Sequence, residues 1–422
     1  MAQKWDVVII GGGLAGFVAA NYLAKRNLSI LVLEKGKKVG GRARTDQIHE
    51  QYFNLGPHAL SKKGKAMAIL EELTIQVPGK SPKLGGVLVK EHLEYSAPFT
   101  PSGLLTTNLL NWKDRIEWAN VLIKVISVNT KKLTTWTFEQ WVQQTTESAN
   151  IQSLLYLLGR LATYCHAPDQ ASAKIIVSHL KTVLNGVLYL DHGWQTIIDQ
   201  LHNKAVVSGV QIETHKRVKH IAPLEQDSFK LVLSHDEEVF GKYVICTTGP
   251  YELQHMLGKK SNFPFTKMKP VKGATFDIAL TQLPNPKKLF AMDINHPLYF
   301  SVHSNYARLS ADAKNAVMHV FKYHHPDETI NAKKVRDELE QFLEKIQPGW
   351  KNYEITSRFI PQITVNQRLP QIGDEKMLES CKRGIPGLYI AGDWASPDFI
   401  LAEGAVSSAK QAAEDIMKKE KS

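Results

Sequence analysis

The sequence is poor in cysteine and has no long apolar run. Its 422 residues include only three cysteines, Cys165, Cys246 and Cys381, which lie far apart along the chain. Three widely spaced cysteines argue against a disulfide framework and against a clustered zinc site, and they fit a reducing compartment. No apolar run reaches the roughly 18 residues that a membrane span needs, and the first residues show no signal-peptide pattern. We therefore expect a cytoplasmic protein without a metal site.

Acidic residues are fewer than basic ones. The chain has 52 Lys and Arg against 41 Asp and Glu, which gives a formal net charge of +11. The lysines are spread along the sequence and no helix-turn-helix or zinc-finger spacing accompanies them, so we expect no nucleic-acid partner. We favour a solvated basic surface, although the terminal KKEKS leaves room for weak peripheral contact with an anionic membrane.

The length predicts more than one domain. A chain of 422 residues exceeds what a single hydrophobic core usually serves, so we expect two domains. A hydrophobic content of 43% and a charged content of 22% are typical of an ordinary soluble protein.

A glycine-rich stretch near the N-terminus indicates dinucleotide binding. The apolar, β-branched run WDVVII at 5–10 predicts a strand; GGGLAG follows at once and leads into a helical pattern. In the G-x-G-x-x-G pattern the first glycine allows the turn and the second lets a pyrophosphate approach the backbone, while the third lets the helix pack on the strand. The start of the helix then faces the phosphates. The candidate cofactor contacts here are Gly11, Gly13, Leu14, Ala15 and Gly16.

An acidic residue follows at the spacing that ribose recognition requires. SILVLE at 29–34 predicts a second parallel strand that ends in Glu34, about 20 residues after the glycines, with Lys35 next to it. A carboxylate at this position can accept hydrogen bonds from both ribose hydroxyls and would repel a 2′-phosphate. An ordinary glycine turn is the alternative, but the complete strand–turn–helix–strand order favours dinucleotide binding.

A second glycine cluster lies just beyond this strand. Gly40, Gly41 and Arg42 can form a loop that wraps a long cofactor, with the guanidinium near its pyrophosphate. These residues resemble the flavoprotein amine oxidase superfamily, which includes phytoene desaturases, protoporphyrinogen oxidases and monoamine oxidases. In that superfamily the glycine doublet and arginine accompany FAD rather than NAD, so the resemblance implies FAD as the cofactor.

FNLGPHAL at 53–60 is similar to the phytoene desaturase-like branch. The resemblance implies that Gly56, Pro57 and His58 lie toward the flavin ring. This chain has Asn54 where that branch usually has an aspartate, which leaves the charge of the turn open. On the residues alone, His58 is more often a structural than a catalytic histidine.

The closing motif is GLYIAGDWASPDFILAEGAVSSAKQAAEDI at 387–416. It predicts a strand that ends at Gly392 and Asp393, followed by a helix that begins near Gly404 and Ala405 with its positive end toward the cofactor. The carboxylate of Asp393 can accept hydrogen bonds from ribityl hydroxyls or lie near the pyrophosphate. The family commonly has Ser-Gly after Glu-Gly-Ala, whereas this chain has two serines and an alanine, a difference at the helix packing surface.

The middle of the chain predicts how the domains interleave. Helical spacing from about 108 to 185 favours a helical insertion, with Thr137 as a helix cap. GVQIETHKRVKHI at 209–221 predicts paired strands, and the resemblance implies that Val218 contacts adenine through its backbone. KYVICTTGP at 242–250 predicts a buried strand that ends near Gly249 and holds Cys246 as a small apolar residue.

We therefore expect an α/β protein in which a Rossmann-like FAD-binding domain is interleaved with an α+β substrate domain, built of a helical cap and a mixed sheet. The FAD-binding domain is assigned to 1–80, 186–250 and 366–422, and the substrate domain to 81–185 and 251–365. No cysteine lies near the closing motif, since Cys381 is upstream, so we expect noncovalent FAD.

The substrate-binding residues are not evident from the sequence. Aromatic and leucine residues of the helical cap could line an apolar tunnel, but simple core packing is the interpretation that we favour. These residues are Trp136, Trp141, Leu154, Leu155 and Tyr156. The resemblance implies that a flavin-facing lysine could start a later strand, and Lys272 is the candidate, with a solvated surface lysine as the favoured alternative.

The reaction predicted is the removal of a hydride from a C–H bond of an apolar or amine-containing small molecule onto flavin N5. The Gly-Pro-His segment and the helical insertion favour the desaturase and protoporphyrinogen oxidase-like branch. One alternative is an amine oxidase with oxygen as acceptor, and another is a non-catalytic binding protein on the same fold, as in GDP-dissociation inhibitors. The acceptor stays open among oxygen, a quinone or another oxidant, and no side-chain acid or base is assigned.

Overall fold

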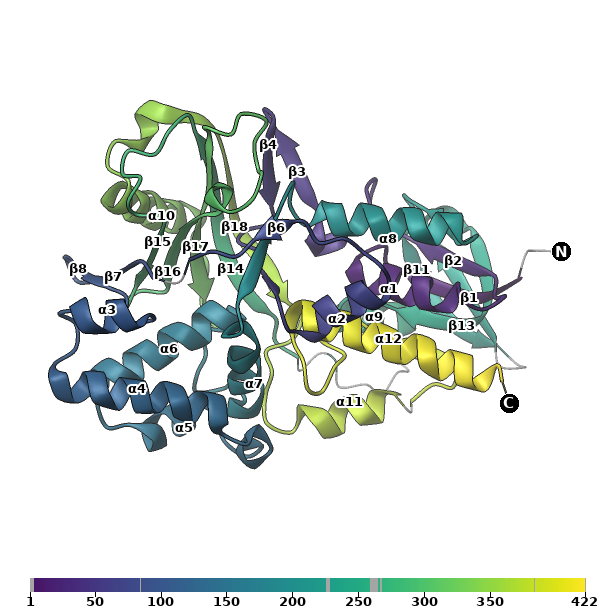
Figure 1. Cartoon of the computed structure of the whole chain (residues 1–422). Helices are drawn as coiled ribbons and strands as arrows, with labels where there is room; N and C mark the ends of the chain where they lie inside the picture. Colours follow the sequence, from purple (N-terminus) through teal and green to yellow (C-terminus); the bar gives the residue numbers. More distant parts are fainter. Residues whose placement is uncertain are drawn as a thin grey trace.

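The computed structural model describes residues 4–83, 85–224, 228–258, 265, 268–382 and 384–421. Figure 1 shows two lobes, each built around a large sheet, with both chain ends on the lobe that carries β1 and α12. Among the described residues, no helix combines the length and the apolar character needed to cross a membrane.

The first lobe is a seven-stranded sheet with parallel strands at its centre. Its path runs β10-β2-β1-β13-β12-β11, and β19 also pairs with β13. The strands β10, β2, β1, β13 and β19 are paired in parallel, whereas β12 pairs antiparallel with both β13 and β11. The bounds are β1 Lys4–Ile10, β2 Ile30–Leu33, β10 Gln211–Glu213, β11 Val218–Leu224, β12 Ser228–Leu233, β13 Glu238–Cys246 and β19 Leu388–Ile390.

Helices cover both faces of this sheet, because its apolar strands alternate between two cores. Val7 and Ile9 of β1 pack into a core with α1, α2, α8 and α12, whereas Val8 and Ile10 pack into a core with α9 and α11. The bounds are α1 Leu14–Leu23, α2 Lys65–Glu72, α8 Gln195–Val207, α9 Pro250–Leu257, α11 Asp374–Lys382 and α12 Leu401–Lys419. Cys246 lies within this packing as a buried free thiol, as expected.

The prediction that residues 209–221 form paired strands is wrong. β10 pairs in parallel with β2, and β11 pairs antiparallel with β12. The chain between them crosses the end of β2: the Glu34 N–H donates to the Glu213 carbonyl, and the Lys216 N–H donates to the Glu34 carbonyl. His215 takes a positive φ of 60° at this crossing, so the segment turns from one side of the sheet to the other.

The second lobe is a seven-stranded mixed sheet in the order β18-β14-β17-β16-β15-β7-β8. All neighbours are antiparallel except β15 and β7, which are parallel. The bounds are β7 Val87–Lys90, β8 Leu93–Ser96, β14 Val271–Leu280, β15 Phe290–Asp293, β16 Leu298–Val302, β17 Ala316–His324 and β18 Glu354–Asn366.

One face of this sheet packs on α10 and the other on the helical cap (Figure 1). α10 spans Ala332–Ile346, and its buried residues recur at spacings of three and four, as its amphipathic pattern requires. The cap comprises α3 Pro101–Thr106, α4 Trp112–Ser127, α5 Phe138–Thr145, α6 Ala149–Thr163 and α7 Ala173–Val183. Thr137 caps α5 in a capping box with Gln140, which confirms the expected cap.

Short elements join the lobes. β3 Thr45–Ile48 pairs with β4 Gln51–Asn54, and β9 Val187–Leu190 lies between β5 Leu60–Ser61 and β6 Gly79–Lys80. The 3-10 helices in the described part of the chain are η1 Gly41–Ala43, η2 Thr130–Leu133, η3 Ser234–Asp236, η5 His303–Asn305 and η6 Trp350–Tyr353. The architecture confirms the expected α/β class, while the domain limits drawn from the sequence stay a proposal.

Candidate functional site

Gly11 and Gly16, at the turn from β1 into α1, are required for different structural reasons. Gly11 has φ +109°, which favours glycine, and a Cβ there would lie 2.5 Å from the Thr247 hydroxyl. A Cβ on Gly16 would lie 2.0 Å from the carbonyl oxygen of Gly11, so only glycine lets α1 pack against the end of β1. The fold itself therefore requires the first and third glycines of the motif.

Gly13 is a glycine that the fold does not require. The nearest atoms to a Cβ at this position would be the Gly40 carbonyl oxygen at 3.8 Å and Gly41 Cα at 3.9 Å, an ordinary contact. Gly13 is the N-cap of α1. The first N–H groups of a helix have no intrahelical partner, and no described side chain caps them here. This open backbone cradle at a positive helix end fits a phosphate group. Leu14 and Ala15 lie in the first turn of α1.

The second glycine cluster packs directly on the first. The Gly40 N–H donates to the Gly12 carbonyl at 2.7 Å, and Gly13 and Gly40 form a β-bridge. Gly40 and Gly41 have φ of 120° and 56°, which place Arg42 in the short helix η1. Residues 11–16 and 40–42 thus form one continuous backbone surface.

Glu34 is held in a fixed orientation at the end of β2. Its Oε2 accepts the Gly12 N–H at 2.8 Å, and its Oε1 accepts the Gly36 N–H at 2.7 Å. Each carboxylate oxygen keeps a further lone pair, so the oriented carboxylate can still accept hydrogen bonds from ribose hydroxyls.

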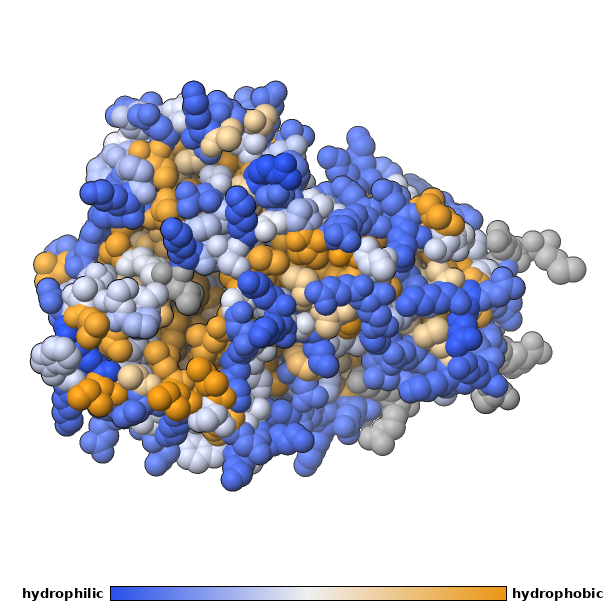
Figure 2. All heavy atoms as spheres, viewed as in Figure 1, coloured by the Kyte–Doolittle hydropathy of each residue, from blue (hydrophilic) through white to orange (hydrophobic). Residues whose placement is uncertain are grey.

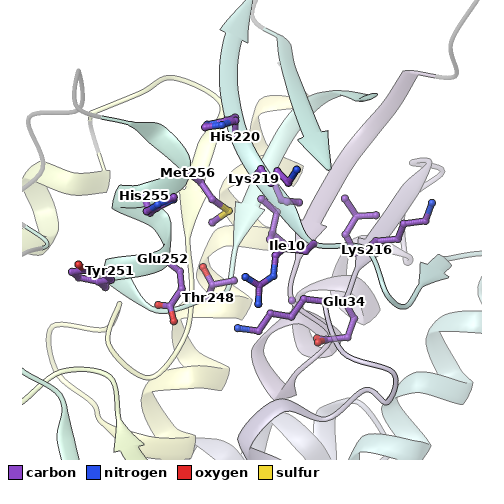
Figure 3. A pocket seen from close by; sticks show the side chains of 15 residues that line it. Ile10, Glu34, Lys216, Lys219, His220, Thr248, Tyr251, Glu252, His255 and Met256 are labelled. Atoms are coloured by element: carbon purple, nitrogen blue, oxygen red, sulfur yellow. The ribbon is translucent and has the colours of Figure 1, made fainter. Parts of the chain in front are cut away.

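A cavity of about 530 Å³ opens beside Glu34. The predicted residues Gly11, Lys35 and Val218 line it as well. Figure 3 shows its wall completed by side chains that the sequence did not single out, from the segment after β13, from β11 and from the crossing before it. These are Lys216, Arg217, Lys219, His220, Thr248, Tyr251, Glu252, His255 and Met256. The basic run at 216–219 was visible in the sequence, but only the crossing of the chain over β2 brings it to the cavity.

Arg42 and Asp393 form a bidentate ion pair across 351 positions of sequence. Nη1 and Nη2 donate to Oδ2 and Oδ1 at 2.5 and 2.7 Å, and the Gln367 N–H donates to Oδ2 at 2.9 Å. Burial alone would lower the pKa of Arg42, but the charge and the hydrogen bonds of Asp393 outweigh it and raise that pKa. The pair joins the second glycine cluster to the closing motif.

Ser408 ties the closing motif to α12. Its hydroxyl oxygen accepts the Gly392 N–H at 2.9 Å, and its O–H has the Gly404 carbonyl at 2.7 Å and the Gly392 carbonyl at 2.9 Å as acceptors. A Cβ on Gly404 would lie 2.8 Å from the carbonyl oxygens of Asp393 and Phe399, so this glycine allows the helix to begin close to the turn. Ser408 therefore holds the Gly-Asp turn against α12.

Three other predicted residues occupy supporting positions. Gly249 is the N-cap of α9, where a Cβ would meet the Glu252 carboxylate at 2.4 Å. Ala405 lies in the first turns of α12. Lys272 lies on β14 opposite His324, and among the described residues it is absent from the lining of both cavities presented here.

The Gly-Pro-His turn links the glycine loop to a second cavity. Gly56 has φ +79°, and the His58 ring interacts with the backbone carbonyls of Gly56 and Arg42. Burial lowers the pKa of His58 to about 4, so its ring is neutral near pH 7. Pro57 and His58 both line the second cavity.

Asn54 serves this turn as a neutral acceptor. Its Oδ1 accepts hydrogen bonds from the Thr45 hydroxyl at 2.7 Å and from the backbone N–H of Trp194 at 3.0 Å. Both partners are neutral donors that an amide oxygen satisfies, so the turn requires no carboxylate here.

The second cavity has a volume of about 250 Å³ and lies where the Gly-Pro-His turn, the start of α12, the helical cap and β16 meet. Its walls are mostly aromatic and aliphatic. The aromatic residues are Phe99, Tyr164, Tyr189, Phe290, Tyr299, Tyr306 and Tyr323, and the aliphatic residues include Leu122, Leu158, Leu161, Leu180, Val183 and Leu184.

The cap residues weighed from the sequence lie elsewhere. Trp141, Leu154 and Leu155 belong to the buried core of the cap, and Trp136 and Tyr156 pack against that core. Core packing, the favoured interpretation, is confirmed. The cavity is instead lined by Leu158 and Leu161, which lie further along α6. Helical spacing alone does not tell which leucines face the core and which face the cavity.

Buried polar groups form the far wall of the second cavity. Tyr299 Oη lies 3.4 Å from His303 Nε2, and the Tyr189 ring stacks on His303 with centroids 3.8 Å apart. Burial holds the pKa of His303 well below its ordinary value. Behind it, His319 donates from Nδ1 to Asp277 at 2.6 Å, and Arg358 pairs with the same carboxylate. Nothing in the sequence pattern singled out His303.

The cap is tied to the Gly-Pro-His turn by one hydrogen bond. Tyr164, which ends α6 in a left-handed conformation, donates its hydroxyl to the Pro57 carbonyl at 2.8 Å. The helical cap and the turn that holds His58 are thereby set relative to each other at the cavity.

Comparisons with known proteins agree with this arrangement. A model of the family described as flavin containing amine oxidoreductase matches residues 14–292 and 300–417. Amine oxidase [flavin-containing] A of Bos taurus is 46% identical over 55 residues, 13% of this chain and 10% of that protein. An L-amino-acid oxidase of Crotalus adamanteus is 47% identical over 57 residues, 14% of this chain and 11% of that protein. The matched stretches thus span about a tenth of the length of these relatives.

Solved structures share the fold over the whole chain. A protein from Exiguobacterium sp. 255-15 assigned as a protoporphyrinogen oxidase has a TM-score of 0.74 at 18% identity, covering 99% of this chain and 100% of that chain. A putrescine oxidase has a TM-score of 0.77 at 14% identity with the same coverage, and cyclohexylamine oxidase from Brevibacterium oxydans IH-35A has 0.73 at 14%, covering 100% of both chains. The chain belongs to the flavin-containing amine oxidoreductase family, whose cofactor is FAD.

Proposed function

We propose that this protein is an FAD-dependent oxidoreductase of the desaturase or dehydrogenase type that acts on an apolar or amine-containing small molecule. The observation that carries the proposal is the aromatic second cavity, which adjoins the Gly-Pro-His turn and the start of α12. Bound FAD would supply the hydride-accepting chemistry, at flavin N5, for a substrate C–H bond held in this cavity. The aromatic and leucine walls bind an apolar substrate and exclude water from it.

The cofactor-binding residues follow from the backbone surface around Gly13. Glu34 would hold the adenosine ribose, and Val218 would contact the adenine through its backbone. The N–H groups at the start of α1 and the loop at Gly40 and Gly41 would hold the pyrophosphate, next to the Arg42–Asp393 pair. Gly56, Pro57 and His58 would lie toward the flavin ring, with the positive end of α12 near it.

We propose that FAD is bound noncovalently. All three cysteines are buried, and among the described residues that line the two cavities there is no cysteine. Burial raises the pKa of Cys165 to about 12 and those of Cys246 and Cys381 to about 11, so their thiols are poor nucleophiles near pH 7. A flavin-sized mass increase of the denatured chain would contradict this proposal.

The charges of the second cavity favour a neutral substrate over a cationic amine. Among the described lining residues Glu403 is the one carboxylate, and its Oε2 accepts the Ala66 N–H at 2.7 Å at the start of α2. Burial raises the pKa of Glu403 and outweighs the hydrogen bond from the Ala66 N–H, which lowers it. A buried carboxylate with a raised pKa attracts an ammonium group less strongly than an exposed one, and the histidines of the wall are neutral near pH 7.

His303 is the proposed acceptor of a substrate proton. Its neutral Nε2 lies beside the Tyr299 hydroxyl at the cavity wall, so the pair can take up a proton that a desaturation releases. Burial, together with the His319 ring that lies 4.5 Å away centroid to centroid, lowers the pKa of His303, so its ring is neutral before it takes up the proton.

An amine oxidase that uses oxygen is the second candidate. The names of the amine oxidase and putrescine oxidase relatives support it, and tyrosine faces can also receive an amine. A non-catalytic binding protein is a third possibility on this fold. The proposal leaves the electron acceptor open among oxygen, a quinone and another oxidant.

An anaerobic substrate screen tests these proposals. The purified yellow protein is mixed with neutral apolar compounds and, separately, with polyamines and aromatic amines, while the flavin absorbance is followed. Bleaching by neutral compounds supports the main proposal, and bleaching by amines followed by peroxide release in air supports the amine oxidase. A protein that stays colourless after FAD is added would overturn both enzyme proposals.

A further inference from the structure

A strip of large apolar side chains is uncovered on α4. Trp112, Ile116, Ile123 and Ile126 are 67%, 65%, 64% and 59% exposed. Their spacing of four, seven and three residues places them on one side of the helix. The opposite side of α4 packs into the core of the cap through Trp118, Val121 and Val125.

Leu105 of α3 is 63% exposed and lies near the start of this strip, because Arg115 donates to the Leu105 carbonyl and its guanidinium lies over the Trp112 ring. We call the five residues the cap strip: Leu105, Trp112, Ile116, Ile123 and Ile126. Figure 2 shows hydrophobic residues gathered over α3 and α4 on the lower left of this face, beside a hollow. A contiguous exposed apolar surface with a polar margin marks an interaction surface.

The charged side chains beside the cap strip are mostly lysines. Lys113 and Lys124 are exposed on α4, and Lys131 and Lys132 follow in η2. The two carboxylates of α4 are engaged elsewhere: Asp114 is buried and accepts the Ser148 hydroxyl, and Glu117 accepts the Thr146 hydroxyl. This combination of apolar side chains and lysines complements an anionic surface with an apolar interior.

The cap strip also borders the second cavity. Leu122 of α4 lines that cavity, and so does Leu184, which follows α7 and is 39% exposed. An apolar compound could therefore pass from a surface that covers the cap strip into the cavity without crossing bulk water. This continuity favours a lipid surface over a protein partner, because a bilayer both covers apolar side chains and dissolves apolar compounds.

We propose that the cap strip docks the protein on the surface of an anionic phospholipid bilayer. Trp112 lies at the level of the headgroups, the isoleucines enter the boundary of the acyl chains, and the lysines contact the lipid phosphates. The choice of a bilayer over a protein partner rests in part on the proposed apolar substrate, whereas the binding test below measures only the outer face of α4 and not the reaction.

Vesicle flotation of the full-length holoprotein tests this proposal. One set of vesicles is phosphatidylcholine alone, and the other is phosphatidylcholine mixed with phosphatidylserine. The protein is expected to float with the mixed vesicles, and raised salt is expected to reduce the bound fraction. The double variant Ile116→Ser/Ile123→Ser is expected to bind at least about tenfold more weakly.

Lys113→Gln/Lys124→Gln is expected to lose about tenfold on mixed vesicles, because each lysine near the surface contributes to binding. The matched control is Val207→Ser, which removes an 89% exposed apolar side chain at the end of α8 and should bind like the unchanged protein. Flavin absorbance and the urea midpoint of each variant report whether it is folded.

Equal binding by the isoleucine variant and by the control, in folded proteins, would overturn the proposal. So would the absence of any flotation with mixed vesicles. If light scattering instead shows a dimer that the isoleucine variant converts to a monomer, a second copy of the chain covers the cap strip and the membrane proposal is wrong.

Discussion

Replacing Gly13 or Gly16 by alanine should have different effects, although both glycines lie in the same motif. Gly16→Ala should reduce stability, whereas Gly13→Ala should weaken FAD binding. Gly16→Ala places a Cβ 2.0 Å from the Gly11 carbonyl oxygen, a backbone atom that cannot move away without shifting β1 or α1. Gly13→Ala places a Cβ 3.8 Å from its nearest neighbour, in a backbone conformation of φ −96° and ψ −170° that alanine can adopt.

The distances set the expected magnitudes. Gly16→Ala is expected to destabilise the apoprotein by about 3 kcal/mol or more, because the clash is with rigid backbone. For Gly13→Ala, a poorer N-cap and a less flexible unfolded chain oppose each other, so the change should stay within about 1 kcal/mol. Its methyl group, however, occupies the proposed approach of the pyrophosphate and should weaken FAD binding at least about tenfold, or 1.4 kcal/mol.

The two variants and the unchanged protein are compared as apoproteins after removal of FAD. Urea unfolding followed by circular dichroism measures stability, and quenching of flavin fluorescence during titration measures FAD affinity. A folded Gly13→Ala protein that binds FAD as tightly as the unchanged chain would refute the assignment of the pyrophosphate to this turn. A Gly16→Ala protein of full stability would refute the packing argument.

Three further predictions concern an ion pair, a hydrogen bond and a buried histidine. Arg42→Ala should destabilise the apoprotein by about 2 kcal/mol, measured by urea unfolding. This is less than for a fully buried pair, because the Arg42 side chain is 39% exposed. A double-mutant cycle with Asp393→Asn that shows no coupling would contradict a stabilising Arg42–Asp393 ion pair. Tyr164→Phe removes the hydroxyl that donates to the Pro57 carbonyl. It should lower the free energy of unfolding, measured by urea unfolding, by about 1 kcal/mol, and it should slow the reduction of the flavin by substrate. An unchanged rate of flavin reduction would show that this hydrogen bond does not position the turn. Burial lowers the pKa of His179 from 6.5 to about 4, so as the pH falls the unfolded chain binds a proton before the folded chain does. The free energy of unfolding should therefore fall by up to about 3 kcal/mol from pH 6.5 to 4. If the urea midpoint of His179→Phe falls with pH as steeply as that of the unchanged protein, this cause is refuted.

The sequence alone predicted the fold class and the segments from which the candidate cofactor site is built. Turn glycines, the strand before them and the helix after them are adjacent in the chain, so their roles follow from local backbone geometry. Gly11 with its positive φ and Gly16 with its close approach to Gly11 are of this kind. The cap of α5 at Thr137 was predictable for the same reason.

Contacts between distant segments were decided only by the tertiary structure. The sequence placed Arg42 and Asp393 near one cofactor, but not in an ion pair with each other, and it assigned no role to His303. The strand pairing at 209–221 was predicted wrongly because hydrophobic alternation does not specify which strand is the partner. Likewise, helical spacing in the cap identified apolar faces without distinguishing the core from the cavity wall, since both are apolar and only packing separates them.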